Sequence, residues 1–361
     1  MPIAKKRLVF VLELLIVLVI FAYTLYNFNV ENFLEALSNI EPLDLLPILV
    51  FEATYYLAHA AAFWLLCKKS FNLSFWDALG GSMLAWLVDI LLPGAFIEGD
   101  VARAIFLRTK GDWPRAVSYT VFYRFLINIT MVIFIVFTSL LAINLLKFYE
   151  QYFLLYMGIV VATLLASAML YLFLWKPQII KKAVLGIAVR LKAKSLDKFE
   201  KDLDTFLAYV AQSSRDFTPR NIYLWGAIIF LLVQWVSGIM TPYFSLKAIG
   251  VEVNPFLIGP GYTILTIYSL ASIGVPFMVG SIDAALITLY ILLGVPKEKA
   301  LVATLLGRSI TIIFSISFIY PIGIHFARKV FSSTSFSSIK ETIDKAIKEY
   351  GFSYGSQGQD T

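Results

Sequence analysis

The chain has 361 residues, of which 59% are hydrophobic and 15% are charged, and its mean hydropathy is +0.79. This composition excludes a soluble domain, and no alternating strand pattern of a membrane barrel is present, so we expect an all-α integral membrane protein. The net charge of +6 indicates basic loops beside anionic lipid and not a protein that binds nucleic acid. The single cysteine, Cys67, excludes an intrachain disulfide.

An apolar run at the N-terminus predicts the first membrane span. It follows Lys5, Lys6 and Arg7 and lacks a small-residue cleavage site, so we expect a signal-anchor helix over residues 1–28. Residues 29–44 contain four acidic residues and no lysine or arginine. This asymmetry places the N-terminus in the cytoplasm and the loop outside.

The second predicted span, residues 45–66, carries two ionisable side chains. Glu52 and His59 are seven residues apart and therefore lie on one face of the helix. Ionisable groups inside a membrane indicate a functional role, so both are candidate carriers of an ion or a proton. The alternative is that each bonds to a neighbour within the helix bundle.

Residues 76–111 predict a re-entrant hairpin and not a crossing. This apolar stretch contains Asp89 and is broken at Pro93 and Gly94, and basic residues typical of the cytoplasmic side flank it at both ends. A segment whose two ends lie on one side of the membrane has not crossed it. Asp89 is a third candidate carrier of an ion or a proton.

Two further spans follow, residues 116–146 and the linking helix 152–175. They lead to a loop over residues 176–220 that contains ten lysines and arginines. Apolar residues at helical spacing within this loop predict an amphipathic helix on the cytoplasmic leaflet. A docking site for a soluble partner is the alternative.

The second half of the chain follows the order of the first. Residues 222–246 predict a span, and residues 255–294 predict an external hairpin that is broken at Pro276 and Gly280. Residues 300–326 predict the last span.

Matching residues recur at an almost constant distance in the two halves. Three residues return 183 positions later and three return 184 positions later: Pro93, Asp100 and Gly111 as Pro276, Asp283 and Gly294, and Ala116, Thr120 and Arg124 as Ala300, Thr304 and Arg308. We infer two repeats, residues 43–175 and 221–327, and a cytoplasmic tail over residues 328–361. An odd number of crossings separates corresponding points. The prediction is six full transmembrane helices plus two re-entrant hairpins in an inverted repeat.

Each repeat has an aspartate early in the second limb of its hairpin and an arginine in the following span. Asp100 and Asp283 either cap a helix N-terminus or take part in function. A guanidinium in the bilayer costs about 3 kcal/mol or more and needs an anion. Arg124 and Arg308 therefore either pair with these aspartates or receive an anionic substrate such as a phosphate. Arg103 adds a cation to the first copy, and all five residues are candidate substrate-binding groups.

Motifs of common enzyme active sites are absent from the sequence. It has no glycine-rich nucleotide loop, no HExxH or GxSxG motif and no metal-spaced cluster of cysteine and histidine. We therefore expect no enzymatic activity, no catalytic residue, no bound metal and no cofactor.

The two copies resemble the lysylphosphatidylglycerol synthase transmembrane-region family, also called flippase-like proteins. The resemblance covers nearly the whole chain and rests on these residues: Pro93-Gly94, Gly99-Asp100, Arg103-Ala104 and Arg124, then Pro276, Gly280, Asp283-Ala284, Gly294-Val295-Pro296, Ala300 and Arg308. Both family glutamates are aspartates here. The resemblance implies movement of lipids, such as aminoacylated phospholipids, across the bilayer. Some members are fused to a cytosolic aminoacyl transferase, for which this chain has no room, so we expect that it does not make the lipid itself.

The function predicted from the sequence is a transporter or flippase for a phosphate-bearing or aminoacylated lipid head group. Membrane lipids are its expected partners, and homo-oligomerisation is left open. One alternative is a non-catalytic membrane subunit that anchors a soluble glycosyltransferase or lipid-modifying enzyme through residues 176–220. A second is an integral-membrane enzyme with carboxylate chemistry. We expect the protein in the plasma membrane with both termini in the cytoplasm.

Overall fold

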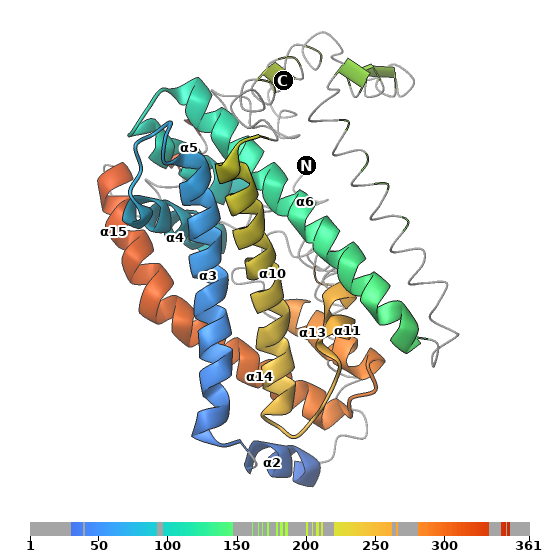
Figure 1. Ribbon diagram of the computed structural model, residues 1–361. Coiled ribbons are helices and arrows are strands. Elements are labelled where there is room, and N and C mark those ends of the chain that lie inside the picture. Colours follow the sequence, from blue (N-terminus) through green and yellow to red (C-terminus); the bar gives the residue numbers. More distant parts are fainter. Residues whose placement is uncertain are drawn as a thin grey trace, which may run out of the picture.

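The computed structural model describes residues 30–38, 40–91, 97–146, 220–261 and 281–331, with isolated residues between 161 and 211, residue 265 and a few residues between 341 and 346. Every element in these ranges is helical, which confirms the predicted all-α class (Figure 1). Other predictions lie outside the described residues: the span within 1–28, the linking helix 152–175, most of the loop 176–220 and of the tail 328–361, and the hairpin breaks at Pro93, Gly94, Pro276 and Gly280.

Four helical stretches in the described part of the chain are long and apolar enough to cross a membrane. They are Pro42–Cys67, Trp113–Ala142, Ile222–Lys247 and Lys297–Val330. Each overlaps one of the full spans predicted from hydropathy between residues 45 and 326. The chain is therefore a helical integral membrane protein.

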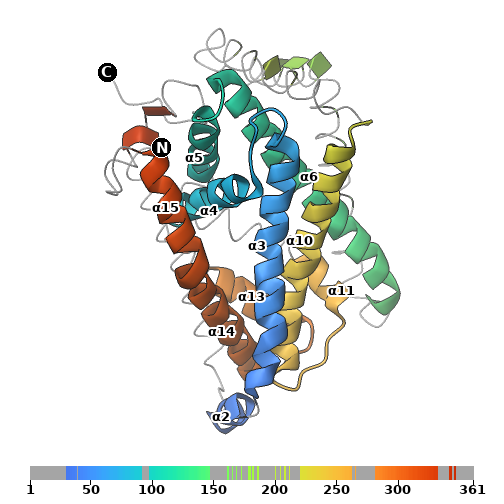
Figure 2. The ribbon, with the colours of Figure 1, turned by 60° about the vertical axis from the view of Figure 1, so that its left-hand side comes forward.

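The centre of the fold is an antiparallel pair of helices, α3 (Leu45–Cys67) and α10 (Ile222–Lys247). They pack against each other along most of their length (Figures 1 and 2). Small side chains permit this close approach, since a Cβ atom at Gly226 would overlap the side chain of Leu65. The pair gives the molecule two ends, which we call the Cys67 end, where α3 ends, and the Lys247 end, where α10 ends.

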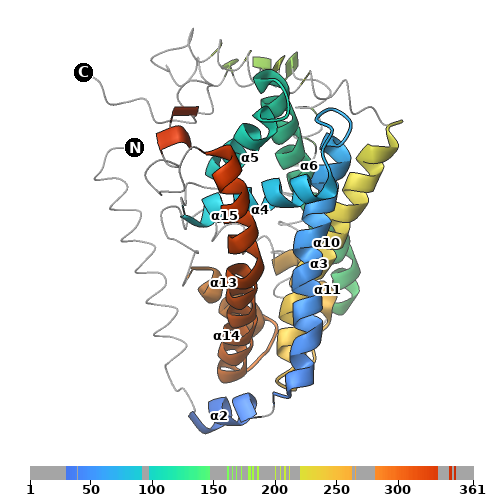
Figure 3. The same ribbon diagram turned by 90° about the vertical axis from the view of Figure 1, so that its left-hand side faces the viewer.

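Two short helices, α4 (Phe75–Leu91) and α5 (Ile97–Arg108), pack against each other nearer the Cys67 end (Figure 3). They have 17 and 12 residues. At about 1.5 Å per residue, neither helix alone crosses a hydrocarbon core about 30 Å thick. The long helix α6 (Trp113–Leu146) follows and packs against α5.

The corresponding segments of the second half lie nearer the Lys247 end. They are α11 (Pro255–Ile258), the 3₁₀ turn η2 (Gly259–Gly261) and α13 (Ser281–Leu292) (Figure 2). Helix α11 begins at Pro255, where the sequence predicts the start of this segment. Its N-cap is Asn254, whose Oδ1 accepts a hydrogen bond from the Phe256 N–H at 3.0 Å.

The last membrane helix is one continuous rod in three parts: α14 (Lys297–Phe314), the π-helical turn η4 (Ser315–Ile319) and α15 (Tyr320–Val330). Pro321 has no backbone N–H and its ring crowds the preceding turn, which accounts for the wide π turn just before it. This rod packs against α4 through α15 and against α10 and α13 through α14. The short helix α2 (Val30–Ser38) lies across the Lys247 end on α14 (Figure 3).

Candidate functional site

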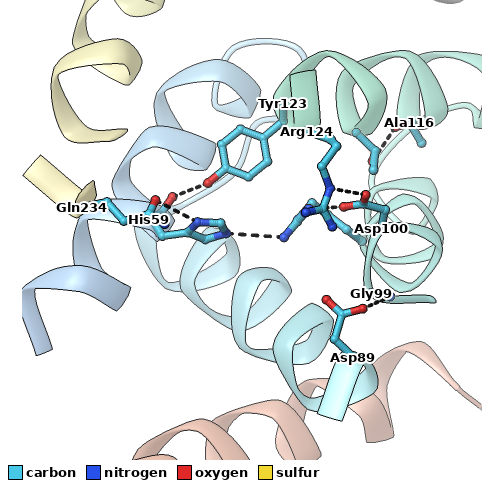
Figure 4. A network of polar contacts seen from close by, with 10 residues as sticks. His59, Asp89, Gly99, Asp100, Ala116, Tyr123, Arg124 and Gln234 are labelled. Atoms are coloured by element: carbon cyan, nitrogen blue, oxygen red, sulfur yellow. Dashed lines mark hydrogen bonds and ion pairs between the residues drawn. The ribbon is translucent and has the colours of Figure 1, made fainter. Parts of the chain in front are cut away.

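The predicted functional residues form two groups in the described part of the fold. The first contains His59, Asp89, Asp100, Arg103 and Arg124, where α3, α4, α5 and α6 meet (Figure 4). The second contains Glu52, Asp283 and Arg308, between α3, α10, α13 and α14. Of the two alternatives that the sequence left open for each arginine, the structure contains a contact with the aspartate: Asp100 for Arg124 and Asp283 for Arg308.

Asp100 holds two arginines at once. It stands in the first turn of α5, where a carboxylate complements the helix dipole. Its Oδ1 atom lies 2.7 Å from Arg103 Nη1, and its Oδ2 atom lies 2.6 Å from Arg124 Nε. Charge-assisted hydrogen bonds of this length are among the strong ones in proteins. The expected pairing of Arg124 with the aspartate of its own repeat is thus present.

The guanidinium of Arg103 is enclosed on several sides. Its side chain is only 4% exposed, and its Nη2 atom lies 3.4 Å from Nε2 of His59. The ring centres of Phe63 and Tyr123 lie 5.4 and 5.0 Å from the guanidinium carbon. Aromatic faces attract cations, and Asp100 supplies the counter-charge. The charge of the Arg103 side chain is therefore neutralised and covered by neighbouring side chains of the protein itself.

His59 connects this group to the central helix α10. Its Nδ1 atom lies 3.1 Å from Oε1 of Gln234, and its backbone carbonyl accepts a hydrogen bond from the Tyr123 hydroxyl at 2.7 Å (Figure 4). A neutral imidazole with its proton on Nδ1 satisfies both ring contacts, because Nε2 then accepts from Arg103. His59 therefore bonds to neighbours within the helix bundle, which was the alternative to a role as a carrier.

Asp89 links α4 to α5. It stands near the end of α4, and its Oδ1 atom accepts a hydrogen bond from the Gly99 N–H of α5 at 2.8 Å (Figure 4). A Cβ atom at residue 99 would overlap the Asp89 carboxylate. A side chain at residue 99 would therefore displace the Asp89 carboxylate.

The second group repeats the pairing with a single arginine. Asp283 stands in the first turn of α13, and its Oδ1 atom lies 2.8 Å from Arg308 Nε. The two side chains are 24% and 18% exposed, so a ligand can still approach them. An aspartate–arginine ion pair is thus present in both groups, and a role of either arginine in substrate binding stays a prediction.

A cavity of about 260 Å³ adjoins the second group. Arg308 and Glu52 line it, and the Glu52 side chain is buried within the bundle. Thr241 of α10 also lines it, and its hydroxyl donates a hydrogen bond to Glu52 Oε2 at 3.5 Å. Glu52 and Arg308 are the charged members among the described residues of the cavity wall.

Three residues of these groups were not expected from the sequence. Gln234 carries a usable signal, because an amide within an apolar span must find a partner. Tyr123 and Thr241 carry none, since tyrosine and threonine are common in membrane helices and bond to many partners.

Metal ligands do not gather in the part of the chain that the structure describes: no three side chains of histidine, cysteine, aspartate or glutamate there could hold an ion together. The chemistry that these residues do support is binding, through carboxylates, guanidinium groups and aromatic rings.

Residues 10–318 match the family model described as "Lysylphosphatidylglycerol synthase TM region". Comparison with curated proteins gives no match. Comparison with solved structures gives none either.

Proposed function

Because the chain belongs to the lysylphosphatidylglycerol synthase transmembrane-region family, we propose that it transports a lipid across the membrane. The transported lipid carries a phosphate-bearing or aminoacylated head group. In this proposal the carboxylates and guanidinium groups bind and release the head group, and no covalent step is assigned to them. Membrane lipids are the partners, with no role for nucleic acid, metal or cofactor.

The observation that carries this proposal is the pair of aspartate–arginine contacts within the membrane region. Arg124 lies on α6 and Arg308 on α14, and each belongs to a stretch long and apolar enough to cross a membrane. Guanidinium groups at such positions are expensive and mark substrate or ion pathways. They are also suited to phosphate, which they bind through a planar fork of N–H donors.

We further propose the full architecture of six crossings and two re-entrant hairpins in an inverted repeat. The central helix pair supports it. At the offset of 183 that relates the hairpins, α3 corresponds to residues 228–250, and this range covers most of α10. The two helices that pack against each other at the centre are therefore counterparts in the repeat.

The position of the short helices also supports this architecture. α4 and α5 lie nearer the Cys67 end, and α11 and α13 lie nearer the Lys247 end (Figures 1 and 3). Hairpins that enter from opposite faces bring their broken backbones toward the middle of the membrane. Such backbone is tolerated where it lines a polar path, and a head group could use that path while its acyl chains stay in lipid.

We propose that the Cys67 end faces the cytoplasm of a cell whose plasma membrane contains the protein. Lys68 and Lys69 follow α3 at this end. Glu31 and Glu35 of α2 are at the other end, where Lys247, Lys297 and Lys299 are exceptions to the pattern. This distribution follows the excess of basic residues in cytoplasmic loops. Glu52, His59 and Asp89 remain the proposed carriers of a coupling ion or proton.

Lipid movement in proteoliposomes tests the proposal directly. A labelled anionic lipid should reach the far leaflet faster than in protein-free vesicles, and Arg124→Ala or Arg308→Ala should slow it. Arg115→Ala is the matched control, because Arg115 contacts Asp112 at the surface and its side chain is 47% exposed. This control should move lipid as fast as the wild type.

One result would replace the proposal with its rival. If no lipid class moves above background under any pH or ion gradient, while the protein is folded, transport is wrong. The leading function would then be anchoring of a soluble glycosyltransferase or lipid-modifying enzyme through residues 176–220. A soluble enzyme that co-purifies in stoichiometric amount would support that rival.

A further inference from the structure

The repeat correspondence shows where the two halves of the molecule differ. At the offset of 183 that relates the hairpins, Arg103 corresponds to Leu286. At the offset of 184 that relates Arg124 to Arg308, Tyr123 corresponds to Gly307. The charged side chain of the first repeat is thus replaced by an aliphatic one. The aromatic side chain is replaced by glycine, which has no side chain.

In the first repeat these two side chains occupy the space beside the aspartate. Arg103 forms its ion pair with Asp100 across one helical turn of α5, and the ring of Tyr123 covers its guanidinium at 5.0 Å. Both residues are buried, with 4% and 0% of their surface exposed. The first repeat therefore contains its own cation, enclosed by its own aromatic rings.

In the second repeat the equivalent positions border open space. Leu286 and Gly307 both line the 260 Å³ cavity beside Arg308. A cavity of this size accommodates a head group, whereas the acyl chains of a lipid would have to remain outside it. The cavity thus lies where the first repeat has Arg103 and Tyr123.

The two groups also differ in charge. The first has two carboxylates, Asp89 and Asp100, and two guanidinium groups. The second has two carboxylates, Glu52 and Asp283, but the single guanidinium of Arg308. Among the described residues, the second group therefore has no second guanidinium beside its aspartate, since Leu286 stands where the first group has Arg103.

Aromatic rings complete the comparison. Tyr55, Tyr56 and Trp86 line the cavity, and the Trp86 ring centre lies 6.1 and 5.4 Å from those of the two tyrosines. Ring faces beside a carboxylate form the common recognition site for organic ammonium groups. Tyr290 adds a fourth ring to the wall.

We propose that the cavity beside Arg308 binds an ammonium group, which takes the place that the Arg103 guanidinium occupies beside Asp100. The ammonium group contacts Glu52 and the aromatic rings, and a phosphate joined to it lies toward Arg308. This inference rests on the proposed transport function and its inverted repeat, and it assigns the head group of the lipid to a zwitterionic class.

The test is a binding measurement that needs no transport. The full chain is placed in nanodiscs of phosphatidylglycerol, which has no amine, and its melting temperature is followed as ethanolamine or phosphatidylethanolamine is added. Ligand that binds only the folded protein raises the melting temperature. A rise with ethanolamine alone means that the free ammonium group suffices, and a rise with phosphatidylethanolamine alone means that it must be carried by a lipid.

Leu286→Arg is the decisive variant, because it recreates the spacing of Asp100 and Arg103 at Asp283 and residue 286. Its guanidinium should fill the site, weaken ammonium binding at least about tenfold and abolish the rise. Leu286→Met is the matched control, since it keeps the volume without charge and should respond like the wild type. If Leu286→Arg does not fold, Glu52→Gln serves instead and should also lose the rise.

The proposal is overturned if neither probe raises the melting temperature of the folded wild type. It is also overturned if the arginine variant, or the glutamine variant in its place, responds as strongly as the wild type. A protein that moves phosphatidylglycerol but ignores both probes refutes the ammonium site alone. A protein that binds a probe but moves no lipid refutes transport and keeps the site.

Discussion

Nδ1 of His59 on α3 lies 3.1 Å from Oε1 of Gln234 on α10, although 175 positions separate the two residues. About two helical turns further along the same interface, the Thr241 hydroxyl donates a hydrogen bond to Glu52, 189 positions away in the chain. Both contacts place polar groups between two otherwise apolar helices, where an unpaired group is costly. They connect α3 to α10 at two points of the interface.

The first prediction concerns the contact of His59 with Gln234. Gln234→Leu should lower the free energy of unfolding by about 1–3 kcal/mol, because the buried His59 ring loses its partner. Thermal or denaturant unfolding in detergent measures the change. Val236→Ala is the control, since Val236 lies on the same helix with 41% of its surface exposed and should cost far less. Equal losses in the two variants would contradict a role for the hydrogen bond.

The second prediction concerns the contact between the limbs of the first hairpin. Gly99→Ala should destabilise the fold by about 1–3 kcal/mol, because its methyl group overlaps the Asp89 carboxylate. Adding Asp89→Ala makes room for that methyl group, so the double variant should recover part of the loss. A double variant that is less stable than Gly99→Ala alone would show that the overlap is not the cause.

The third prediction compares the two aspartates. Asp100→Asn removes the counter-charge of two arginines, Arg103 and Arg124, whereas Asp283→Asn removes that of one. Loss of one partner of a buried ion pair costs about 3–5 kcal/mol. We therefore expect the larger fall in melting temperature for Asp100→Asn, measured on both purified variants in one detergent. The reverse order would show that Arg103 does not depend on Asp100.

The fourth prediction separates pairing from substrate binding at Arg308. Arg308→Ala and Asp283→Ala should each lower the melting temperature, and the double variant should be milder than their sum, since it leaves no lone charge. If the arginine also receives the lipid, the folded double variant should remain inactive in proteoliposomes. Restored lipid movement in the double variant would end the substrate role of Arg308.

The fifth prediction concerns topology. In a Cys67→Ser background, single cysteines at Glu35, Lys110, Glu200 and Lys297 are labelled with an impermeant thiol reagent in intact cells. The proposed inverted arrangement places residues 35 and 297 outside and residues 110 and 200 inside. Only the first two should react before the cells are opened. Labelling at 110 but not at 297 would overturn the arrangement.

Local properties of the sequence were sufficient to predict much of this protein. Hydropathy over about 20 residues marks a crossing, because the membrane thickness sets the helix length, and four of the predicted spans are present in the described chain. The repeat also named Asp100 with Arg124 and Asp283 with Arg308 as possible pairs, while substrate binding stayed open as the alternative for each arginine. An arginine in a membrane needs an anion, and the repeat places one aspartate near each arginine.

Other features depended on how the helices pack, so the sequence alone could not supply them. Asp100 could have capped a helix, yet it holds both Arg103 and Arg124 because α5 and α6 bring those side chains to the same carboxylate. The cavity beside Arg308 has walls from helices that are far apart in the chain, and its volume depends on the side chains that meet there. The sequence determined the spans and the candidate partners of each arginine, since these follow from local hydropathy and charge. Only the tertiary structure decided their surroundings, because contacts such as His59 with Gln234 depend on the register of two antiparallel helices.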